Sequence, residues 1–216
     1  MLTENQTLMT RARESLKGNW GIVVGVTLVY FLITAIAGSP KFIKIAGFII
    51  GGPMALGYQI FFLSLIRRKN ITFGMLFEGF NNFLTALGAY VLMIIFVILW
   101  LLLLIVPGII AAMSYSLTWF IIADNPAIGP LEAIRKSKQM MMGHKWKLFY
   151  LSCRFWAWIL LGFVTAGIGF LWIGPYMMAS FAHFYQDLLD NAAVASSTDG
   201  QVRTLPTDGV TPDAPV

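Results

Sequence analysis

The stretch LLLLIVPGIIAAMSYSLTWFIIADNP, residues 101–126, decides how often the chain crosses a bilayer. It belongs to a run without any charged residue that extends from Gly79 to Ala123. A helix of that length would reach ~65 Å, about twice the ~30 Å hydrocarbon core of a membrane. The run is therefore either one span with a long apolar overhang or two spans that fold back at Pro107 and Gly108.

Basic residues decide between these alternatives, because cytoplasmic loops of membrane proteins carry an excess of lysine and arginine. If the run makes two spans, Lys41 and Lys44 lie on one face of the membrane and eleven basic residues on the other. If it makes one span, the count is six against seven. We therefore predict a hairpin whose tip points outward, with these eleven residues in the cytoplasm: Arg11, Arg13, Lys17, Arg67, Arg68, Lys69, Arg135, Lys136, Lys138, Lys145 and Lys147.

The composition excludes an ordinary soluble domain. The chain of 216 residues is 58% hydrophobic and 12% charged, whereas soluble domains carry about 25% charged residues. The net charge of +5 indicates basic residues beside anionic lipid headgroups rather than a nucleic-acid partner. The lone Cys153 lies in an apolar run, and we expect a packing residue there without an intramolecular disulfide.

The apolar runs predict an all-α polytopic membrane protein with six transmembrane helices. These helices form three hairpins, at residues 21–66, 83–123 and 148–188, within a transmembrane domain at residues 20–189. The basic count places both termini in the cytoplasm.

Polar segments flank the membrane domain. Residues 1–19 are predicted to form a cytoplasmic interfacial segment, and residues 190–216 a disordered cytoplasmic tail, because the tail lacks apolar periodicity and is rich in Thr, Asp, Pro and Gly. Each hairpin is preceded by a polar or amphipathic segment that we expect to lie as a helix in the cytoplasmic interface: residues 3–18, 70–82 and 130–144.

The second member of each hairpin begins with proline and glycine. Proline disfavours helix at the residue before it, and glycine accepts a tight turn. We therefore expect the hairpin turns at Pro53, at Pro107 and Gly108, and at Gly174 and Pro175. Two interpretations of this similarity stay open, a true triplication of one unit or the common constraints of hairpins.

Polar residues within the last predicted hairpin form the candidate site. Arg154 lies seven residues beyond Lys147, hence ~10 Å deeper along a helix, and a charge at such depth needs a partner. The returning helix brings His183, Asp187 and Asp190 to similar depth. We predict a pair between Arg154 and Asp187 or Asp190, as a tie between helices. The alternative is a charged vestibule or a proton relay through His183.

Motifs for catalysis are missing from the sequence. It contains no phosphate loop, no G-x-S-x-G elbow and no H-E-x-x-H pair. Met140–Met142 beside His144 do not form a metal site, because consecutive residues of a helix do not share a face. We expect no catalytic residue, no cofactor and no metal ligand.

Seven segments of the chain resemble a known family. They are SLKGNWG, GPMALGY, LFEGF, LWLLLLIVPGIIAAMSYS, IIADNP, EAIRKSKQMMMGHKWKLF and GIGFLWIGPYMMASFAHFY, in this order. Together they resemble the bacterial integral-membrane family numbered 975 among the domains of unknown function, over residues 10–188. That family is distantly similar to the membrane domain of glycerophosphodiester phosphodiesterases. The resemblance implies a six-span protein of the bacterial cytoplasmic membrane, and no catalytic domain accompanies it here.

These observations favour a non-enzymatic membrane protein that acts as a scaffold, an assembly partner or an envelope-homeostasis factor. Its expected partners are anionic lipids at the cytoplasmic face and another membrane protein. The alternative is a transporter or channel subunit for a small molecule or a lipid, which repeated hairpins with glycine and proline breaks also suit.

Overall fold

The computed structural model describes every residue of the chain except 1–2, 38–43, 104, 166, 168 and 204–216. The described residues form helices joined by turns and short loops, and no strand occurs among them. This confirms the all-α class. The helices are α1 (Asn5–Leu16), α2 (Trp20–Ala37), α3 (Lys44–Ile66), the 3-10 helix η1 (Phe73–Asn82), α4 (Phe83–Leu103), α5 (Ile105–Tyr115), α6 (Thr118–Asp124), α7 (Pro130–Met140), α8 (Lys145–Val164) and α9 (Phe170–Arg203).

Several helical stretches are long and apolar enough to cross a membrane, which supports a membrane protein. Over the described residues there are four: Trp20–Ala37, Ile49–Ile66, Phe73–Leu102 and Pro107–Asp124. The last two include most of the long uncharged run from Gly79 to Ala123. Helices α8 and α9 are not among these four; the middle of α9 carries polar residues that lower its hydropathy.

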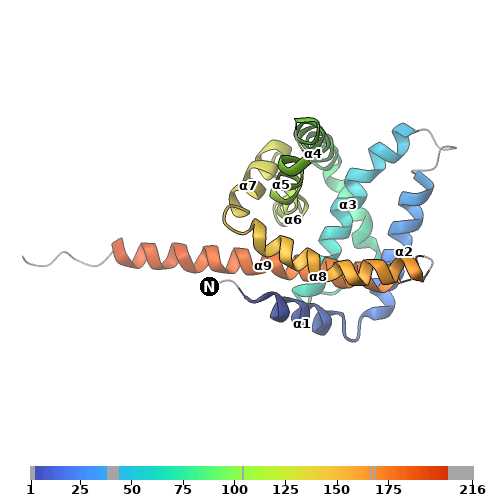
Figure 1. The fold of residues 1–216 in the computed structure, drawn as a ribbon, viewed down its shortest axis with the longest axis horizontal. Coiled ribbons are helices and arrows are strands. Elements are labelled where there is room, and N and C mark those ends of the chain that lie inside the picture. Colours follow the sequence, from blue (N-terminus) through green and yellow to red (C-terminus); the bar gives the residue numbers. More distant parts are fainter. Residues whose placement is uncertain (1–2, 38–43, 104, 166, 168, 204–216) are drawn as a thin grey trace, which may run out of the picture.

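Helix α3 lies at the centre of the fold and contacts α2, η1, α4, α6 and α9. Helix α9 packs against α2, α3 and α8, and Figure 1 shows α1 on the opposite side of α9 from most of the other helices. Large side chains fill the space between these elements, and the fully buried rings are Phe61, Phe62, Phe120, Phe155, Phe184 and Tyr185. The interior around α3 and α9 is therefore largely aromatic.

The proline–glycine stretches do not form the hairpin turns, and this corrects the sequence prediction. Pro53 lies inside α3, and Gly174 and Pro175 lie inside α9. Pro107 and Gly108 follow the boundary between α4 and α5 and lie in the first turn of α5. There proline removes an N–H that has no partner within the helix. Apolar helices also accept proline in their interior when neighbouring groups satisfy the freed carbonyl.

Glycines allow close contact between helices instead. A Cβ atom on Gly57 would lie 1.9 Å from the carbonyl oxygen of Leu76, and one on Gly79 would lie 2.0 Å from that of Pro53. Helices α3 and η1 therefore cross backbone against backbone, where only glycine fits. A Cβ on Gly108 would lie 2.5 Å from a leucine side chain of α4, so this glycine lets α5 pack against α4.

The three amphipathic segments are helical, as expected. They correspond to α1, η1 and α7. Helix α1 buries Leu8, Ala12 and Leu16, which recur every fourth residue and therefore share one face. Helix α7 begins at Pro130 and has Glu132 in its first turn, where the positive end of the helix dipole favours a carboxylate.

Helix α9 is longer than expected. The tail predicted to be disordered begins at residue 190, but α9 continues to Arg203, so the prediction is wrong over residues 190–203. The packed first half of α9 already provides the nucleus, and extending a helix is far easier than starting one. Ala192, Ala193 and Ala195 are strong helix formers. Figure 1 shows this end of α9 projecting from the body of the protein; residues 204–216 lie outside the described residues.

Candidate functional site

Polar side chains follow the middle of α9 at helical spacing. They are His183, Gln186, Asp187, Asp190 and Asn191, which recur every three or four residues and so occupy neighbouring faces of the helix. In this region α9 packs against α1, α3 and α8. Two sets of contacts result, one centred on Asp187 and the other on Arg67 at the end of α3.

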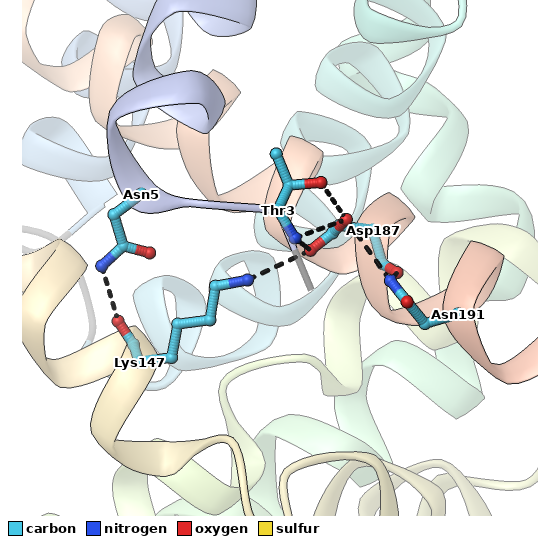
Figure 2. Close-up of polar contacts among 5 residues, drawn as sticks. All are labelled: Thr3, Asn5, Lys147, Asp187 and Asn191. Atoms are coloured by element: carbon cyan, nitrogen blue, oxygen red, sulfur yellow. Dashed lines mark hydrogen bonds and ion pairs between the residues drawn. The ribbon is translucent and has the colours of Figure 1, made fainter. Parts of the chain in front are cut away.

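Asp187 accepts hydrogen bonds from two other segments of the chain. Its side chain is 6% exposed. The backbone N–H of Thr3 donates to Oδ2 at 2.9 Å, and the Thr3 hydroxyl donates to Oδ1. Lys147 Nζ lies 3.1 Å from Oδ2, and Asn191 caps the arrangement by donating to the Asp187 carbonyl at 2.6 Å. Figure 2 shows that Thr3 and Lys147 both reach the Asp187 carboxylate.

Two further hydrogen bonds hold α1 in place. Asn5 Nδ2 donates to the carbonyl of Lys147 at 3.2 Å, as Figure 2 shows. At the other end of α1, Ser15 Oγ lies 2.9 Å from His183 Nε2. The segment from Thr3 to Ser15 is therefore fastened to α8 and α9 at both ends and not only through its apolar face.

Arg154 does not take part in this site, which corrects the predicted pairing. Its side chain is exposed and forms no ion pair with any described residue. Asp187 instead contacts Lys147, which lies two helical turns closer to the start of α8 than Arg154 does. Asp190 accepts a hydrogen bond from Gln186 Nε2 at 2.9 Å. Of the predicted cluster, His183, Asp187 and Asp190 thus lie together on α9, and Arg154 lies apart from them.

A second set of contacts surrounds Arg67. Both terminal nitrogens of its guanidinium donate to the carboxylate of Asp124, with Nη2 at 2.9 Å from Oδ2. Nε and Nη2 also donate to Gln186 Oε1, at 3.1 and 3.0 Å. The Tyr185 hydroxyl donates to Asp124 Oδ2 at 3.0 Å. These bonds join the ends of α3 and α6 to the middle of α9 through one planar guanidinium.

The ion pair between Arg67 and Asp124 is partly solvated. The hydrogen bonds to Asp124 raise the pKa of Arg67, although burial acts in the opposite direction, so the guanidinium stays charged. The two side chains are 28% and 23% exposed, and a pair with that access to water contributes about 1 kcal/mol or less. Sequence reasoning missed this pair, although a signal existed: each residue directly follows a predicted span on the same face of the membrane.

A separate cavity of about 510 Å³ lies between α5 and α8. Its lining is apolar apart from one lysine and consists of Ile109, Ile110, Met113, Met142, Gly143, Lys145, Trp146 and Phe149. The first turns of α5 thus lie beside the first turns of α8. Helix α5 ends at Tyr115 and α6 starts at Thr118, so residues 105–124 do not form one uninterrupted helix.

The polar groups of the site are mainly paired with one another. Asp124, Asp187 and Asp190 each accept a hydrogen bond, and His183 contacts Ser15. Across the part of the chain that the structure describes, no three His, Cys, Asp or Glu side chains are placed to hold a metal ion. The arrangement is suited to fastening helices together.

One family model matches the chain, over residues 1–117 and over residues 93–192. Its description is "Protein of unknown function (DUF975)". The chain belongs to this family. Membership agrees with the resemblance of the seven sequence segments and covers the site on α9, and the description assigns no activity to any of these residues. No curated protein matches the chain, and no solved structure matches it.

Proposed function

We propose that this member of the family is a non-enzymatic protein of the bacterial cytoplasmic membrane that acts as a scaffold, an assembly partner or an envelope-homeostasis factor. The observation that carries the proposal is the use of the polar residues. Asp187, Arg67 and Asp124 join helices to each other, and aromatic rings fill the space between those helices. A rigid body of this kind supports a role in holding partners.

The proposed topology has six spans in three hairpins, with both termini in the cytoplasm of a bacterium. The count of eleven basic residues against two supports it. The pair between Arg67 and Asp124 also supports it, because contact between these residues is expected if two spans end on the same face. Two details make the topology worth testing. Helices α8 and α9 carry more polar residues than the other spans, and Ile109 lines a cavity together with Lys145, although the topology puts them near opposite faces.

Alkaline phosphatase fusions test this topology, because the enzyme is active only outside the cytoplasm. We expect activity for fusions after Ser39, Gly108 and Gly167, and none after Lys69 or Lys145. Activity at Lys69 contradicts the whole arrangement. An inactive fusion at Gly108 beside an active one at Ser39 replaces the second hairpin by a re-entrant loop that returns to the cytoplasm. An inactive fusion at Gly167 removes the third hairpin from the membrane.

The proposed partners are anionic lipids at the cytoplasmic face and another membrane protein. The exposed basic residues of α7, Arg135, Lys136 and Lys138, supply the charge for both. The test is purification of the full chain in a mild detergent, beside a variant with Arg135→Glu and Lys136→Glu. We expect one protein to accompany the wild-type chain in a fixed ratio and to be lost from the variant. Equal recovery from both refutes a role for α7 in assembly.

The alternative function is a transporter or channel subunit, and Gln59 favours it. Gln59 lies inside α3, is 8% exposed, and its Oε1 has no hydrogen-bond partner among the described residues. A buried amide oxygen without a partner in an apolar span is costly, and buried polar groups in spans mark pathways in transporters. Uptake by proteoliposomes that Gln59→Leu abolishes would establish this alternative. The likeness to the membrane domain of glycerophosphodiester phosphodiesterases stays a prediction.

A further inference from the structure

The cavity between α5 and α8 opens at the surface of an apolar span. Three of its lining residues, Ile109, Ile110 and Met113, belong to the stretch Pro107–Asp124, which is apolar enough to cross a membrane. Ile109 and Ile110 remain 50% and 45% exposed. In a bilayer such a surface is covered by lipid, so the hydrocarbon chains of lipids are the molecules present at its mouth.

The opposite wall of the cavity has the character of a membrane–water boundary. Trp146 is 71% exposed and Tyr150 is 62% exposed. The ring centroids of Trp146 and Phe149 lie 5.6 Å apart, and those of Trp146 and Tyr150 lie 6.4 Å apart. Exposed aromatic side chains in a cluster are typical of the headgroup level, where one end of the ring is apolar and the other wet.

Lys145 is the charged residue of the lining. Its side chain is partly exposed and forms no ion pair with a described residue, unlike Lys147, which is held by Asp187. No aspartate or glutamate belongs to the lining. An apolar cavity with a free cation at its edge complements a molecule with one anionic group and a long hydrocarbon chain.

We propose that this cavity is a binding site for one anionic phospholipid, with an acyl chain between α5 and α8 and the phosphate on Lys145. The site rests on the proposed insertion of the chain in a membrane. It also requires Ile109 and Lys145 to lie on the same side of the bilayer, which is the re-entrant form of the second hairpin. It differs from general attraction of anionic lipids to basic residues because it holds one lipid in one place. Lipid bound there joins the α4–α5 pair to the start of α8.

The experiment uses the full chain in mild detergent, titrated with phosphatidylglycerol or with the zwitterionic phosphatidylcholine, and counts bound lipids by native mass spectrometry. We expect one tightly bound phosphatidylglycerol. Lys145→Gln should weaken it about fivefold, the factor that corresponds to ~1 kcal/mol for one lysine at an anionic surface. Lys138→Gln is the matched control, because Lys138 is exposed on α7 and outside the lining. It should change the affinity less than twofold.

A second variant tests the cavity itself. Ile110→Trp fills the space without a change of charge and should weaken both lipids at least tenfold. If this variant does not fold, Met142→Trp replaces it, because Met142 is 62% exposed and lines the same cavity. Retention of phosphatidylglycerol by a folded, filled variant overturns the proposal. An equal loss of phosphatidylglycerol affinity in Lys145→Gln and Lys138→Gln also overturns it, because that result indicates unspecific attraction. A dimer that the filled variant disrupts overturns it as well, because a second copy of the chain is then the occupant.

The two proposals fail in different ways. An active fusion at Gly108 puts Ile109 and Lys145 on opposite faces, so it rejects the lipid site and leaves the membrane scaffold standing. Loss of the lipid effects with an inactive fusion at Gly108 has the same meaning. A fusion pattern without membrane insertion rejects both proposals.

Discussion

Replacing Asp187 by alanine should loosen α1 and α8 from α9. The change removes the acceptor of the Thr3 N–H, of the Thr3 hydroxyl and of the Lys147 ammonium. Each of these is worth about 1 kcal/mol net, hence ~3 kcal/mol in sum. The Lys147 side chain is 19% exposed and regains water, which lowers the cost. We therefore expect a loss of about 2 kcal/mol in the free energy of unfolding.

Unfolding in mixed detergent, followed by tryptophan fluorescence, measures this loss, and limited proteolysis reports the release of α1. The matched controls are Lys147→Ala and the double variant Asp187→Ala with Lys147→Ala. A pair in contact gives a coupling energy of about 1 kcal/mol between the two changes. Strict additivity of the two single changes, or an N-terminal segment as resistant to protease in Asp187→Ala as in the wild type, would refute the reasoning.

Three other changes test the packing and the remaining charges. Gly79→Ala pushes a Cβ against the Pro53 carbonyl and should cost about 2 kcal/mol or more in detergent unfolding, whereas Gly21→Ala, with open space around it, should be almost neutral; equal effects would contradict the tight crossing. Arg67→Lys loses the bidentate contact with Asp124 and should cost about 0.5 kcal/mol by the same assay. A larger loss would mean that the ion pair is less accessible to water than its exposure indicates. Arg154→Ala should change the free energy of unfolding by less than ~0.5 kcal/mol. A cost above about 1 kcal/mol would instead support the predicted pairing of Arg154.

The helical class and the apolar spans could be predicted because both depend on composition and periodicity. Long uncharged runs specify helices that satisfy their own backbone in lipid. The amphipathic segment around Leu8, Ala12 and Leu16 is visible as a pattern with helical spacing, and the structure buries these residues. The count of charges favours two spans in the run at 79–123, and two of the candidate spans include parts of that run; the hairpin itself stays a prediction.

The details of packing could not be predicted in this way. Proline and glycine were interpreted as turn residues from their local chemistry, yet Gly57 and Gly79 are explained by neighbours that lie 19 and 26 residues away along the chain. Arg154 and Lys147 share a face of α8, and sequence alone does not give the level at which α9 crosses that face. The expected depth along the helix axis favoured Arg154 as the partner of Asp187, whereas the packing of α9 against α8 brings Asp187 to Lys147. Such choices depend on how two helices meet.

The hydrogen bonds from Thr3 to Asp187 also have a consequence in time. These residues are 184 positions apart, and a ribosome adds roughly 5–20 residues per second. Helix α1 therefore waits roughly 10–40 s, while the rest of the chain is made, before its acceptor on α9 exists. Throughout that interval Leu8, Ala12 and Leu16 lack their final neighbours, and the membrane surface is the apolar environment within reach. The binding of α1 to α9 is thus a late step of folding, and if α1 lies in the membrane interface as predicted, it exchanges lipid for protein at that step.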